Sequence, residues 1–267
     1  MPRAYVPSCT IGIDLASQPK RTAACVIDWT ASPPQVRWSE KDLTDQVLLE
    51  LMLHPHVSRV GIDAPFGWPQ PFVTALTQHD STGTWPLEPD DYEAQRELVL
   101  RSTDRVVRDG LGPQPLSVST DRISFAAMRC ARLLSALAAA GHPVDRAGSG
   151  KVIEVYPAAA LRCWGISPSK EPTDPGGYKG KGVSASARRS ALVSRLVDQA
   201  RGSLDISTDL RDQCREDDDK LDALLCALVA RAADTNRVQP APTEAGVART
   251  EGWIVLPNQA PLSTTIA

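Results

Sequence analysis

Two short apolar segments that end in aspartate constrain the fold more than any other feature of this sequence. The first, IGID, covers residues 11–14, and the second, GID, covers residues 61–63. Such a run is typical of a buried strand, and a carboxylate at its end lies at the carboxyl edge of a sheet, where open α/β sheets bind ligands. Either aspartate alone could simply cap the next turn. Because Asp14 and Asp63 share the same context, we predict that they end neighbouring strands and face a common site.

The order of the other segments predicts an α/β protein with a five-stranded sheet flanked by helices. Three strand-like runs are joined by polar or proline-containing connectors, which indicates an antiparallel meander. A helix, a fourth strand, helical material, a fifth strand and a last long helix follow. The predicted strands cover residues 10–15, 22–27, 35–39, 57–63 and 151–156, and the predicted helices cover 42–53, about 90–109, about 124–140, about 186–201 and about 218–233.

We expect one domain that carries an insertion. The chain has 267 residues, of which 42% are hydrophobic and 23% charged, so it has enough apolar material to build a core. The region at about 67–150 does not fit the strand order, because it begins with a loop rich in proline, glycine and threonine up to Pro89 and continues with helices. We therefore predict a single domain over 1–267, with a helical insertion at about 67–150 and a polar C-terminal tail at about 258–267.

The sequence favours a cytoplasmic protein that does not enter a membrane. Residues 1–14 lack the basic region and apolar core of a secretory signal. The longest nearly apolar stretch, 133–140, is far shorter than the ~20 residues that a bilayer requires. The six cysteines form no CxxC pair, which is typical of reduced thiols rather than of disulfides or a zinc site.

A third acidic motif, DDDKLDALLCA at residues 217–227, supplies two more candidate ligands. On a helix, Asp219 and Asp222 lie about 60° apart on one face. A stripe of alanine and cysteine begins beside them, and small side chains let a helix approach a sheet closely. That packing would bring both aspartates to Asp14 and Asp63. The alternative is an acidic helix start favoured by the helix dipole, which explains Asp222, already one turn inside, less well.

Converging carboxylates without basic partners repel one another, and bound divalent cations relieve this repulsion. A site made only of oxygen ligands selects Mg²⁺ or Mn²⁺, so we expect one of these ions at the aspartates. The GSGK segment at 148–151 is not a phosphate-binding P-loop, because a strand follows it where a helix is required.

Taken together, these motifs resemble a known family. The segment at 219–227 is similar to the last motif of ribonuclease H-like resolvases. The wider set resembles domain-of-unknown-function family 429, whose members are predicted to be ribonuclease H-like nucleases. The matching segments, in chain order, are GIDLAS (12–17), GIDAPFGWP (61–69), RSTDRVVR (101–108), EVYPAA (154–159), DDKLDALLCA (218–227) and EGWIVLP (251–257).

The resemblance implies a ribonuclease H-like fold and assigns roles to carboxylates. It implies that Asp14, Asp63, Asp219 and Asp222 are the catalytic and metal-binding residues. Glu154 lies in a family motif on the predicted fifth strand and is a further candidate metal ligand. Strand alternation leaves open whether it faces the site or is a satisfied structural group.

Basic residues in the middle of the chain are candidates for substrate binding. Arg101, Arg105 and Arg108 share one face of a predicted helix, which suits a phosphate clamp because arginine offers forked donors. Pairing with neighbouring acids on the helix surface is the alternative. Arg122, in a second Thr-Asp-Arg tripeptide, and Lys179, in a Gly-rich loop, complete the expected substrate-binding set.

Together, these expectations predict a metal-dependent nuclease that hydrolyses phosphodiester bonds of DNA or RNA by a two-metal mechanism. The net charge of −3 gives no global basic surface to support nucleic-acid binding. Two other functions stay open. One is a phosphoryl-transfer enzyme acting on a small substrate, which the missing Gly-rich loop after the first strand disfavours. The other is a non-catalytic module of the same fold that binds nucleic acid or a nucleotide.

Overall fold

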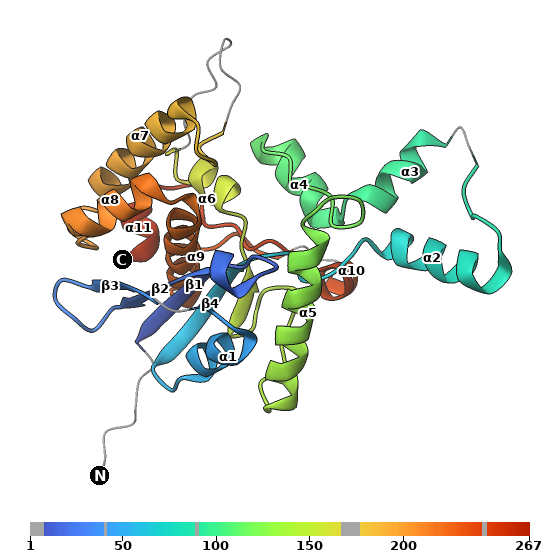
Figure 1. Cartoon of the computed structure of the whole chain (residues 1–267), viewed down its shortest axis with the longest axis horizontal. Helices are drawn as coiled ribbons and strands as arrows, with labels where there is room; N and C mark the ends of the chain where they lie inside the picture. Colours follow the sequence, from blue (N-terminus) through green and yellow to red (C-terminus); the bar gives the residue numbers. More distant parts are fainter. Residues whose placement is uncertain (1–7, 40–41, 89–90, 167–176, 242–244) are drawn as a thin grey trace. The chain divides into compact units, whose positions relative to one another are not determined.

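The structure is a computed structural model that describes residues 8–39, 42–88, 91–166, 177–241 and 245–267 (Figure 1). The chain divides into two compact units. The first unit holds residues 1–63, 155–239 and 255–267, and the second holds residues 64–154 and 240–254. The predicted insertion therefore corresponds to most of the second unit, which also includes a segment near the C-terminus.

A five-stranded sheet has the strand order β3-β2-β1-β4-β5. β1 pairs antiparallel with β2, and β2 with β3, whereas β1 and β4 run parallel. The predictions of an opening meander and of adjacent, parallel first and fourth strands are confirmed. This mixed sheet has the arrangement of the ribonuclease H-like fold. The strands are β1 (Cys9–Asp14), β2 (Ala23–Asp28), β3 (Gln35–Trp38), β4 (Val57–Asp63) and β5 (Val152–Glu154).

The helix α9 (Asp218–Asp234) packs against β1, β2 and β4 of the sheet (Figure 1). Its residues from Leu221 to Ala230 are all buried. A Cβ atom added to Gly12 would lie 1.9 Å from the carbonyl oxygen of Ala223, and one added to Gly61 would lie 2.5 Å from that of Cys226. The glycines of β1 and β4 and the small residues of α9 are therefore required together, as the alanine and cysteine stripe predicts.

Besides the single turn η1, the other helices of the first unit include three that the sequence did not predict. α6 and α8 are too short for a clear apolar periodicity, and α11 lies in the expected polar tail. Leu262 and Ile266 of α11 are buried, so this segment is packed instead of extending as a tail. The helices are η1 (Pro19–Arg21), α1 (Asp45–Leu53), α6 (Pro157–Cys163), α7 (Val183–Ala200), α8 (Thr208–Glu216) and α11 (Leu262–Ile266).

The second unit is largely helical, as expected for the insertion, but its helices differ in detail. α2 occupies a segment that was expected to be a loop. Its prolines lie at the start of the helix, where proline favours a helix instead of breaking it. The helix expected at about 90–109 is divided into two helices, because Arg101 has extended backbone angles. Its expected start, Asp90, lies outside the described residues. The helices are α2 (Gln70–Thr82), α3 (Tyr92–Val99), α4 (Ser102–Leu111), α5 (Ser124–Ala139) and α10 (Ala245–Glu251).

Among the helices of the described ranges, none combines the length and the apolar character needed to cross a membrane.

Candidate metal centre

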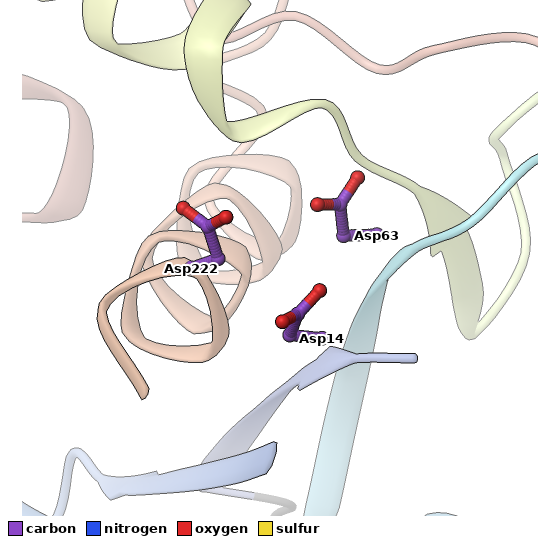
Figure 2. A group of neighbouring side chains, drawn as sticks. All are labelled: Asp14, Asp63 and Asp222. Carbon is purple, nitrogen blue, oxygen red and sulfur yellow. The ribbon is translucent and has the colours of Figure 1, made fainter. Parts of the chain in front are cut away.

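Three aspartates of the first unit converge at the carboxyl ends of β1 and β4. Asp14 is the last residue of β1, Asp63 is the last residue of β4, and Asp222 comes from α9. Each offers a carboxylate oxygen that lies within 4.8 Å of those of the other two. Figure 2 shows the three carboxylates around one common space.

Local sequence explains this convergence. Parallel pairing of β1 with β4 puts Asp14 directly opposite Asp63. The side chain of Asp217 accepts hydrogen bonds from the backbone N–H groups of Asp219 and Lys220, which fixes the start of α9. Asp222 then lies one turn inside the helix, on the side that the glycine contacts press against the strands.

Burial and mutual repulsion dominate the electrostatics of the cluster. Burial, followed by the charges of Asp63 and Asp222, raises the pKa of Asp14 well above its usual value. Asp222 is fully buried, whereas the side chain of Asp63 remains 19% exposed. The cluster is therefore accessible to solvent on the side of Asp63, and its negative charge is concentrated in a buried environment on the side of Asp222.

Asp219 lies beside this cluster and belongs to a second acidic group with Asp217 and Asp218. Burial and the charge of Asp217 raise the pKa of Asp219, and a hydrogen bond with the Asp14 side chain opposes this rise. Asp219 therefore contacts the cluster through Asp14. It also lines a hollow of about 350 Å³, together with Asp217, Lys20, Arg21, Trp38 and Lys220.

Two residues of the loop before α7 bind Asp222 directly. The hydroxyl of Tyr178 donates a hydrogen bond of 2.5 Å to Asp222 Oδ1. Lys179 Nζ lies 2.5 Å from Asp222 Oδ2 and 3.7 Å from Asp63 Oδ2. Burial would lower the pKa of Lys179, but the carboxylates of Asp222 and Asp63 outweigh it and raise this pKa well above its usual value. The ammonium group therefore stays charged.

Lys179 was expected to bind substrate. The structure places its ammonium group on the carboxylates of Asp222 and Asp63, and its contact with a substrate stays a prediction. No pattern in the sequence indicates this pairing, because a loop has no periodicity that fixes the direction of a side chain. Tyr178 was not in the expected site for the same reason. Its burial, unusual in a Gly-rich loop, is visible only in the folded chain.

Glu154 and Arg101 form a buried ion pair within the second unit. Arg101 Nη2 lies 2.6 Å from Glu154 Oε1, and Arg101 also donates two hydrogen bonds to Asp104 from its guanidinium group. Both partners are only 2% exposed. The structure therefore does not support Glu154 as a metal ligand or Arg101 as a phosphate clamp, because each neutralises the other in the core of this unit.

The remaining expected substrate ligands, Arg105, Arg108 and Arg122, also belong to the second unit. Arg105 lies 4.0 Å from Glu97, and Arg108 lies 2.7 Å from Asp109, so both form the surface pairs that the alternative interpretation expects. Arg122 is exposed and lies two residues before the start of α5 at Ser124. Contact of these arginines with a substrate stays a prediction.

The sequence between the first strand and the last helices matches one family model. That model, described as protein of unknown function (DUF429), covers residues 12–246. The chain belongs to the DUF429 family. Neither a curated protein nor a solved structure matches the chain. Membership in DUF429 supports the recognised motifs, and it assigns no activity to Asp14, Asp63 or Asp222.

Proposed function

We propose that this protein is a metal-dependent phosphodiester hydrolase that acts on nucleic acid. The observation that carries the proposal is the convergence of Asp14, Asp63 and Asp222 at the carboxyl ends of two parallel strands. Three carboxylates so close together repel one another, and the single charge of Lys179 offsets only part of this repulsion, which favours a divalent cation among them. Their oxygen-only donor set fits Mg²⁺ or Mn²⁺.

The chain's own residues have separate roles in this proposal. Asp14 and Asp63 would hold the cation at the partly exposed side of the cluster. Asp219, through its hydrogen bond with Asp14, would orient that carboxylate. A divalent cation bound here would act as a Lewis acid on a phosphoryl oxygen and lower the pKa of a bound water.

The missing phosphate loop and the number of acidic side chains favour a nuclease over the other two functions. The strand order is that of ribonuclease H-like proteins, and residues 15–22, between β1 and β2, contain no glycine-rich phosphate loop of the kind that a kinase requires. Four acidic side chains at one sheet edge also exceed what a purely binding module needs. We further propose a cytoplasmic location, because all six cysteines are free and buried.

The experiment is a cleavage assay with the full chain on single- and double-stranded DNA and RNA, with Mg²⁺, Mn²⁺ or EDTA. We expect cleavage only with a divalent cation, and its loss in Asp14→Asn and Asp63→Asn. Asp205→Asn, at an exposed aspartate of the same unit, is the matched control and should retain activity. Metal-dependent release of phosphate from nucleotides, without cleavage of any polymer, would favour the phosphoryl-transfer alternative. No activity in any condition would contradict the proposal.

A further inference from the structure

A hollow of about 350 Å³ lies beside the metal centre, within the first unit. Its walls come from the connector between β1 and β2, from the end of β3 and from the start of α9. Asp219 joins the two places, because it lines the hollow and its side chain forms a hydrogen bond with Asp14. Ligand pockets begin at about 300 Å³, so the hollow can hold a small part of a substrate next to the carboxylates.

The connector between β1 and β2 is a short, closed turn. Asp14, the last residue of β1, pairs with the first residue of β2, so the connector leaves and returns at one point of the sheet edge. The hydroxyl of Thr22 accepts a hydrogen bond from the backbone N–H of Ala16, which closes the connector at its base. Lys20 and Arg21 lie in the helical turn η1 inside this connector. The fold therefore holds two basic residues at the edge that carries Asp14.

The three cations of the hollow differ in what they contact. The ammonium group of Lys220 donates a hydrogen bond of 2.5 Å to Gln213 and lies 5.9 Å from the centre of the Trp38 ring, so it belongs to a fixed wall. Lys20 and Arg21 line the hollow and are exposed. Among the described residues, neither of them forms an ion pair with a carboxylate. Their charges are therefore available to an anion.

The acidic residues of the hollow lie mainly at the start of α9. Asp42, Asp217 and Asp219 line it. The carboxylate of Asp217 accepts hydrogen bonds from two backbone N–H groups of α9, and Asp219 contacts Asp14, so both are engaged within the fold. A divalent cation at the metal centre would offset part of their charge. The connector then remains the part of the hollow that attracts an anion.

We propose that this hollow binds a backbone phosphate of the nucleic-acid substrate, with Lys20 and Arg21 as its ligands. This inference rests on the proposed function and adds to it the residues that hold the polymer beside the reacting phosphodiester. Arginine offers forked donors and lysine a compact charge, and together they suit one phosphate group. Phosphate contacts fix the position of a strand and carry no sequence information, so DNA and RNA strands should bind alike through these two residues.

The test measures binding of a labelled single-stranded DNA and of a labelled single-stranded RNA by fluorescence anisotropy, in EDTA and at several salt concentrations. We compare the wild type with the double variant Lys20→Gln/Arg21→Gln. Binding should weaken about tenfold, and the slope of log affinity against log salt should fall by about 0.7, as expected for one lost phosphate contact to a single strand. In cleavage assays with Mg²⁺, KM should rise about tenfold while kcat stays unchanged.

The matched control is Arg201→Gln/Arg237→Gln, which removes the same charge from two exposed arginines of the same unit. Arg237 follows the end of α9, whereas the hollow lies at its start, and roughly 25 Å of helix separate them. Exposed charges at such distances are screened at ordinary salt. The control should therefore keep the affinity, salt slope and KM of the wild type, and thermal melting should show that both double variants fold.

The possible outcomes separate this inference from the proposed function. Equal effects of the two double variants, or an unchanged salt slope and KM in Lys20→Gln/Arg21→Gln, would overturn the inference. Metal-dependent cleavage by the wild type would still leave the hydrolase intact. Binding that depends on Lys20 and Arg21 in a protein that cleaves neither strand with any metal would support the phosphate site and contradict the hydrolase. A wild type that neither binds nor cleaves these strands would contradict both proposals.

Discussion

Arg101 and Glu154, 53 residues apart in sequence, meet in the core of the second unit through two hydrogen bonds of 2.9 Å and 2.6 Å. The second oxygen of Glu154 also accepts a hydrogen bond from the backbone N–H of Phe66. Asp104 also forms an ion pair with the guanidinium of Arg101. The pair thus ties together a strand, a helix start and the chain that enters this unit.

Glu154→Gln should destabilise the protein without affecting metal binding. The substitution keeps the size of the side chain but leaves a buried guanidinium with less compensating charge, which costs roughly 3–5 kcal/mol of unfolding free energy. Urea unfolding would measure this loss. Because Glu154 is not a metal ligand in our proposal, Mn²⁺ affinity of the folded variant should match the wild type, and a large loss of affinity would restore Glu154 to the site.

Gly12→Ala should be among the most disruptive small substitutions in the chain. The new methyl group would lie 1.9 Å from the carbonyl oxygen of Ala223, so β1 and α9 would have to separate. We expect a loss of at least ~3 kcal/mol in unfolding free energy. Gly110→Ala in α4 is the contrast, because nothing lies within 4 Å of the added Cβ. It should stabilise the chain by about 0.5–1 kcal/mol. Equal effects of the two changes would contradict the close packing of α9.

The metal-free protein should become more stable as pH falls from the raised folded-state pKa of Asp14 toward the usual pKa of an aspartate. The pKa of Asp14 is raised in the folded state, so in this range the folded chain binds more protons than the unfolded chain. Its unfavourable contribution is absent below the unfolded pKa and grows as pH rises toward the folded pKa. Urea unfolding at several pH values should show this slope in the wild type and a smaller slope in Asp14→Asn. Identical slopes would show that Asp14 does not titrate as inferred.

Charge reversal of surface arginines tests whether the second unit contacts nucleic acid. If Arg108 and Arg122 meet phosphates, replacing both with glutamate should weaken binding and flatten its dependence on salt, because fewer counterions are released. Fluorescence anisotropy with labelled DNA and RNA at several salt concentrations measures both quantities. The same slope in variant and wild type would assign these arginines to the helix surface alone.

Much of the site could be predicted because strands and helices have regular periods. Asp14 and Asp63 end apolar strands, and the spacing within α9 orients Asp222. Glu154 could not be resolved in this way, since a short strand that is buried on both faces has no polar side to mark its direction. Its partner Arg101 looked like part of an exposed arginine face because the break before α4 has no distinct sequence signal.

The loop residues were beyond the reach of such patterns. The path of the chain at Tyr178 and Lys179 is set by Arg189 and by the start of α9. Asp218 at that start accepts a hydrogen bond from Gly180, 38 residues earlier in the sequence. Residues 167–176 of the same connection lie outside the described residues. Only tertiary contacts place this lysine among the carboxylates.

The contact of Gly12 and Gly61 with α9 has a consequence for how this protein tolerates change. The spacing between Asp222 and the two strand aspartates is set by main-chain atoms that touch main-chain atoms. Substitutions among the surrounding apolar side chains can change the stability of the fold, but they do not change the distance between α9 and the two strands. The arrangement of the carboxylates is therefore preserved when core residues change during evolution. It depends on Gly12 and Gly61, where any side chain would be too large.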